Sequence, residues 1–184
     1  MNIRKNVDYS DMFVALDAAM SAEKQQMKLY CKIGKAVGQR LEKGAAVAAA
    51  EYLSSHYPDI QGFSPRNLRR MRDFYRIYKE QPALLSLALQ LGWTQNVVIL
   101  EADLSMELRG WYLKAVCQFG WSKAELNEKI ANNAHDVIVL DNYEKACCGV
   151  EQEGTANLYK VDSIYCKENR TRQLIQMVRL TIKL

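Results

Sequence analysis

Apolar residues recur every three or four positions from about residue 11 to residue 135, and this periodicity is the strongest constraint on the fold. The spacing is typical of α-helices that bury one face, whereas the alternation typical of β-strands is nearly absent before residue 136. The three prolines, at positions 58, 65 and 82, stand where a helix is expected to begin or to have just ended. The sequence therefore predicts an all-α, multi-helix domain over residues 8–135.

The C-terminal region, residues 136–184, has a different character. Its first half mixes glycine, asparagine and acidic residues, and its end, "ENRTRQLIQMVRLTIKL", is basic and apolar. We interpret it as a linker followed by a tail that is irregular or holds a short strand. One alternative is a terminal helix. The other is a foreign tail produced by truncation or a shifted reading frame.

The longest predicted helix runs from about Asp11 to Leu41 and carries a heptad-like apolar stripe. A straight helix of this length would span about 45 Å, more than the width of a small domain. We interpret the stripe first as a core-facing surface, and alternatively as a seam for oligomerisation, as a homodimer or with a partner chain. The stripe consists of Leu16, Met20, Met27, Tyr30, Val37 and Leu41.

Shorter helices are expected to follow, and two of them begin in a similar way. "GWTQNVVIL" begins at Gly92 and "GWSKAELNEKI" at Gly120, so each start has glycine, tryptophan and a hydroxyl residue. Ser122 with Glu125 predicts a capping box, and Thr94 is expected to cap its helix without one. We expect all three tryptophans to pack in the core.

The helix predicted from Ser64 and Pro65 onward has two distinct faces. At about 100° per residue, its large apolar side chains fall within one arc and its cations fall in the remainder. The apolar set is Leu68, Met71, Phe74, Tyr75 and Tyr78. The cations are Arg66, Arg69, Arg70, Arg72, Arg76 and Lys79. The helix is therefore expected to dock through one face and to present the cations on the other.

These cations favour an acidic partner. With only Asp73 and Glu80 against them, residues 64–80 carry a net charge of +4, equal to the formal charge of the whole chain. Arginine offers paired donors that suit phosphates and guanine edges. With the preceding helix, this segment resembles a helix-turn-helix unit with a long turn. We therefore expect binding of nucleic acid, most simply DNA, through these six residues; a solvated or internally paired face is the alternative.

Several segments, in this order, resemble the N-terminal domain of the YhcG-type family, proteins regarded as bacterial nucleases and long catalogued as of unknown function. The segments are "LYCKIGKAV", "GFSPRNLRRMRDFY", "GWTQNVVIL", "WYLKAV" and "GWSKAELNEKI", within residues 10–135. The matching positions are Gly62, Phe63, Ser64, Arg66, Asn67, Leu68, Met71, Phe74, Tyr75, Trp93, Trp121 and Ser122. The resemblance implies a helical, helix-turn-helix-like domain followed by a PD-(D/E)XK nuclease domain.

The chain departs from that family pattern in two places. Relatives often have serine and histidine after the first tryptophan of the pattern, where this chain has Thr94 and Gln95. A PD-(D/E)XK site needs an Asp and a downstream E-x-K to hold a divalent metal, and the nearest segment here is Glu168-Asn169-Arg170. We therefore expect no enzyme activity and no catalytic residues in this chain, with any cutting done by a separate nuclease subunit.

The remaining composition argues against other classes of site. The five cysteines form no C-x-x-C pair, and the two histidines, His56 and His135, lack metal-ligand spacing from a cysteine. We expect reduced thiols, no metal and no cofactor. No apolar run approaches the ~20 residues of a membrane span, and the N-terminus lacks the apolar core of a signal peptide. These features predict a cytoplasmic protein without membrane association.

Overall fold

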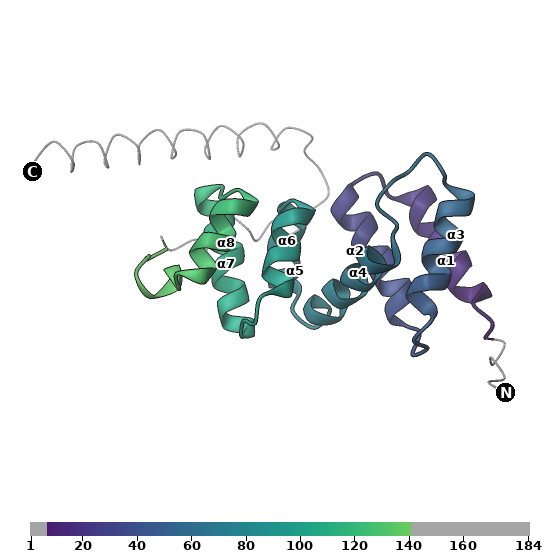
Figure 1. The fold of residues 1–184 in the computed structure, drawn as a ribbon, viewed down its shortest axis with the longest axis horizontal. Coiled ribbons are helices and arrows are strands. Elements are labelled where there is room, and N and C mark those ends of the chain that lie inside the picture. The colour runs from purple at the N-terminus through teal and green to yellow at the C-terminus, as the bar shows by residue number, and fades with distance from the viewer. Residues whose placement is uncertain (1–6, 141–184) are drawn as a thin grey trace, which may run out of the picture.

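The computed structural model describes residues 7–140, which form eight α-helices and one short 3-10 turn (Figure 1). The all-α prediction is confirmed for this part of the chain, whereas the predictions for the tail from residue 141 onward fall outside it. The helices are α1 (Ser10–Ala22), α2 (Gln26–Gly38), α3 (Ala45–His56), α4 (Pro65–Tyr78), α5 (Pro82–Gln90), α6 (Trp93–Glu101), α7 (Met106–Phe119) and α8 (Lys123–Ala131), followed by η1 (Ala134–Asp136).

The single long helix predicted from Asp11 to Leu41 is wrong, because two helices, α1 and α2, occupy this range. The backbone is extended at Glu23 and again at Gln25. The Glu23 carboxylate accepts a hydrogen bond from the Gln25 amide at 3.1 Å and pairs with Lys32 at 3.1 Å. Glu23 therefore satisfies a backbone donor beside the start of α2, which lets the chain turn and pack α2 against α1.

The break places most of the predicted stripe inside the protein's own core. Leu16, Tyr30 and Val37 are buried in one cluster and Met27 is buried in a second, while Met20 is half-buried. Leu41 is 92% exposed and lies beyond the end of α2. The core-facing interpretation accounts for the buried members, and the oligomeric state of the protein stays a prediction.

The most extensive contact between helices is that of α2 with α4, which cross at a glycine. A Cβ atom on Gly34 would overlap the carbonyl oxygen of Met71 and would stand 2.7 Å from its carbonyl carbon. Only a residue without a side chain therefore allows the two backbones to approach this closely. One turn later, a Cβ on Gly38 would meet only side-chain atoms, of which the nearest is in the Tyr75 ring at 3.4 Å.

Helix α4 connects two halves of the molecule. Figure 1 shows α1–α3 at one end and α5–α8 at the other, with α4 between them. Leu68 and Met71 belong to the hydrophobic cluster of the first half, whereas Phe74 and Tyr78 belong to that of the second. All four side chains are fully buried, so the apolar face predicted for this helix is confirmed at these positions; Tyr75 is half-buried.

Polar side chains hold the α5–α6 region in place. The Asn96 amide group is buried and donates to the carbonyl oxygens of Ala88, at 2.8 Å, and Gly92, at 3.1 Å. Arg109 from α7 donates to the carbonyls of Ile99 and Ala102, so it closes the C-terminal end of α6. The carbonyls of Ala88, Gly92 and Ala102 also accept backbone amides, so these side chains add second hydrogen bonds at the helix ends.

The two predicted helix starts differ in outcome. The capping box of α8 is confirmed, because Ser122 and Glu125 each accept from the other's backbone amide. The Thr94 cap is wrong, since Gly92 is the N-cap residue of α6 and has no side chain with which to cap it. Thr94 lies one residue inside the helix, because Trp93 already has helical geometry. Trp121 is buried, and Trp93 and Trp111 pack half-buried against the clusters.

Replacement of Gly34 by alanine should destabilise the fold by about 3 kcal/mol, because the obstacle is backbone and cannot rotate away. Urea denaturation followed by circular dichroism measures the change. Gly38→Ala is the matched control on the same helix, and its added methyl meets a side chain at ordinary contact distance. The free energy of unfolding of the control should stay within about 1 kcal/mol of that of the wild type. Equal effects of the two changes would contradict the close approach.

Candidate nucleic-acid interface

The chain enters α4 through a sharply defined turn. Gly62 has a φ of 101°, a conformation that L side chains rarely adopt, and Ser64 is the N-cap residue. The Ser64 hydroxyl accepts from the Asn67 amide at 3.3 Å, and the Asn67 side chain donates to the Gly62 carbonyl at 2.6 Å. Pro65 occupies the first helical position. The predicted helix start is confirmed, and its polar residues fix where the basic face begins.

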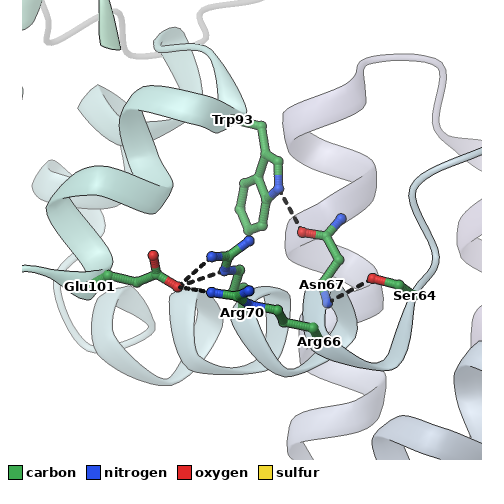
Figure 2. Close-up of polar contacts among 6 residues, drawn as sticks. All are labelled: Ser64, Arg66, Asn67, Arg70, Trp93 and Glu101. Carbon is green, nitrogen blue, oxygen red and sulfur yellow. Dashed lines mark hydrogen bonds and ion pairs between the residues drawn. The ribbon is translucent and has the colours of Figure 1, made fainter. Parts of the chain in front are cut away.

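Asn67 also links this turn to α6. Its side-chain oxygen accepts the indole N–H of Trp93 at 2.9 Å (Figure 2). The Trp93 ring packs edge-on against Tyr30 and Phe74, with centroids 5.1 and 5.9 Å apart. Trp93 therefore joins α2, α4 and α6 at one point beside the basic helix, which supports the core role expected for it.

The six predicted contact residues occupy the outward side of α4 but differ in exposure. Arg66, Arg69, Arg76 and Lys79 are exposed, whereas Arg70 and Arg72 are half-buried. From Arg66 to Arg76 the helix rises about 15 Å. The structure thus brings the cations together on one surface, as the helical wheel predicts, and α2 and α6 border this surface because both pack against α4.

Glu101 at the end of α6 pairs with two of the arginines. The Nε and Nη2 atoms of Arg70 lie 2.7 and 2.5 Å from one carboxylate oxygen of Glu101, and Nη2 of Arg66 lies 3.9 Å from the same oxygen (Figure 2). Arg66 nevertheless keeps 76% of its side chain exposed, compared with 25% for Arg70. The pairing therefore restrains Arg70 while it leaves Arg66 accessible.

The other cations have looser partners. Arg72 pairs with its neighbour Asp73 at 2.9 Å, Lys79 with its neighbour Glu80 at 3.4 Å, and Arg76 donates to the Gly38 carbonyl at 3.4 Å. Within residues 7–140, the side chain of Arg69 makes no hydrogen bond or ion pair. Ion pairs that remain partly exposed to water contribute little, so the surface remains strongly basic and open to an anionic partner.

A groove of about 680 Å³ runs beside the N-terminal half of α4. Arg70 of α4, Trp93 and Glu101 of α6, and Lys123 and Asn127 of α8 line it. Lys123 and Asn127 are exposed on its rim. The groove is continuous with the basic face because Arg70 belongs to both. Its lining residues lie far apart in the sequence. No pattern in the sequence indicated Glu101 or Lys123 as site residues.

Gln95, which stands where relatives often have histidine, has a structural contact in this chain. Its side-chain amide donates to the carbonyl oxygen of Trp121 at 3.1 Å. The contact joins the start of α6 to the start of α8, and a neutral imidazole N–H could make a similar bond. The substitution is therefore compatible with a packing role for this position.

The described residues carry neither a candidate metal centre nor a membrane span. Over residues 7–140, no three or more His, Cys, Asp or Glu side chains gather closely enough to hold a metal ion. Within the same range, no helix is both long enough and apolar enough to cross a bilayer. Cys31 is a free thiol, and burial raises its pKa. The Glu168-Asn169-Arg170 segment lies outside the described residues.

The fold and this surface define an all-helical domain that presents one basic helix beside an open groove. The family model described as the DUF1016 N-terminal domain matches residues 14–137. The chain belongs to this family, and the resemblance to the N-terminal domain of YhcG-type proteins is thereby confirmed. Comparison with curated proteins and with solved structures found no match.

Replacement of Asn67 by alanine should lower the free energy of unfolding by about 1–2 kcal/mol, because the Trp93 indole and the Gly62 carbonyl both lose their partner. Urea denaturation measures the loss. Asn127→Ala is the control, since within residues 7–140 the Asn127 side-chain amide donates only to the Lys123 carbonyl, one turn earlier on an exposed helix face. An Asn67→Ala protein as stable as the control would show that the link between α4 and α6 is dispensable.

Proposed function

We propose that this domain binds nucleic acid, most simply duplex DNA, through the outward face of α4. The observation that carries the proposal is the one-sided distribution of charge on this helix. Four of its apolar side chains are fully buried, while Arg66, Arg69, Arg76 and Lys79 remain exposed. A surface of this kind attracts phosphates over a range set by the salt concentration.

The packing of α4 supports a recognition role. Because α2 holds the helix at the Gly34 crossing and Trp93 holds its N-terminal end, the backbone that bears the arginines is fixed before any partner arrives. Helix α3 precedes α4 through residues 57–64 and packs against it. This order of elements is similar to a helix-turn-helix unit, in which the second helix meets the DNA.

The chemistry of the exposed side chains also favours phosphate. Guanidinium groups donate paired hydrogen bonds to phosphate oxygens, and Arg69 has no competing partner within residues 7–140. We propose that the domain binds without cleaving, and that a nuclease domain or a separate nuclease subunit would supply the cutting step. The oligomerisation function of the Leu16–Leu41 stripe receives no comparable support, because most of its residues are buried within the chain.

The double change Arg69→Ala, Arg76→Ala should weaken binding of a fluorescently labelled DNA duplex on the order of tenfold at low salt. The slope of log K against log salt should fall by about 0.9 for each phosphate that the variant no longer neutralises. Fluorescence anisotropy titrations over a salt series measure both quantities.

The double change Lys24→Ala, Lys114→Ala is the matched control, because it removes two exposed cations outside α4. It should retain most of the affinity. A wild-type protein that does not bind the duplex at low salt, or equal losses in the two double variants, would refute the proposal. A parallel titration with duplex RNA shows which nucleic acid is preferred.

A further inference from the structure

Two arginines of α4 contact a single carboxylate at the groove beside this helix, and a lysine lines the same groove. Arg70 lines the groove from α4, Glu101 from α6 and Lys123 from α8. Arg66 reaches the same Glu101 oxygen at 3.9 Å, and Arg70 donates to it through two nitrogens. The arrangement is that of an anion site in which one of the protein's own side chains supplies the anion.

The position of Glu101 is unfavourable for its own helix. It is the last residue of α6, where unpaired carbonyl groups make the helix end negative and a carboxylate is disfavoured. Its side chain is 49% exposed, so it fills no space in the core. The two guanidinium groups are the contacts that stabilise the carboxylate there.

The pair between Arg70 and Glu101 is well formed but weak enough to exchange. Both donors of Arg70 meet one oxygen at short distance, which holds the guanidinium in a defined orientation. Because the pair is partly exposed to water, its net contribution is small, and another anion can replace the carboxylate. A phosphate accepts the same paired hydrogen bonds from arginine.

We infer that this groove is a binding site for a backbone phosphate of nucleic acid, and that the Glu101 carboxylate occupies the site until the phosphate displaces it. The inference rests on the proposed function, since it names a second contact region for the same partner. Thr94, Lys123 and Asn127 on the rim are exposed, so the groove admits a polymer from the side. Lys123 has no ion pair within residues 7–140 and adds a further cation to the lining of the groove.

The change Glu101→Gln tests the inference, because it keeps the shape of the side chain and removes the competing charge. Affinity for the labelled duplex should rise about three- to fivefold, the range expected from release of a partly exposed ion pair. The salt dependence should become steeper, since Arg66 and Arg70 are then free to neutralise phosphates.

Asp103→Asn is the matched control, because it removes an exposed carboxylate two residues away that has no ion pair within residues 7–140. It should change the affinity less than twofold, because an exposed carboxylate that pairs with no cation interacts only weakly with the arginines through water. Thermal unfolding checks that both variants remain folded.

A second comparison tests the contribution of Lys123 to the groove. In the Glu101→Gln background, Lys123→Ala should reverse much of the gain in affinity. Lys114→Ala in the same background removes an exposed lysine of α7 that does not line the groove, and should leave the gain intact.

Three results would overturn the inference and remain distinguishable from failure of the proposed function. In the first, Glu101→Gln would bind the duplex with the same affinity as Asp103→Asn. In the second, Lys123→Ala and Lys114→Ala would have the same affinity in the Glu101→Gln background. In both cases the double variant at Arg69 and Arg76 would still bind the duplex weakly. Alternatively, inorganic phosphate at matched ionic strength would displace the duplex far better than chloride, which would indicate a site for free phosphate. If neither the wild type nor Glu101→Gln bound the duplex, the proposed function itself would be refuted.

Discussion

The fold depends on the close approach of α2 and α4 at Gly34. The position opposite Gly34 is the backbone of Met71, so no rearrangement of side chains could create room for a larger residue. This contact fixes the position of α4 along its axis and its rotation about that axis. These two quantities determine which side chains of α4 reach solvent. The basic surface is therefore a consequence of a backbone contact on the opposite side of the same helix.

Helix α4 also determines how the two halves of the molecule are joined. Its first turns complete the cluster formed with α1, α2 and α3, and its later turns complete the cluster formed with α5, α7 and α8. Trp93 packs against both clusters and bonds Asn67 at the start of α4. The groove lies where the two halves meet, which explains why its walls come from helices distant in sequence.

Local patterns in the sequence predicted the features that depend on neighbouring residues. Ser64 with Pro65, and Ser122 with Glu125, mark helix starts because the capping interactions span only a few positions. The two faces of α4 followed from its periodicity alone. The break at Glu23 was missed because the apolar spacing of the stripe continues on both sides of the tight turn. The pairing of Glu101 with Arg70 joins residues 31 positions apart, and no local rule predicts such contacts. Its one sequence signal, an acidic residue at a helix C-terminus, is weak.

The membership of α4 in both clusters has a consequence for the dynamics of the domain. Proteins open locally where a segment can leave without disturbing its neighbours. Neither half can open in this way without loosening α4, since each contributes buried contacts to the same helix. An anion held on the outer face of α4 would consequently slow hydrogen exchange in α2 and in α7 alike, although neither helix carries the arginines. If α4 binds an anionic partner, as proposed, the effect on hydrogen exchange would therefore extend over both halves of the domain.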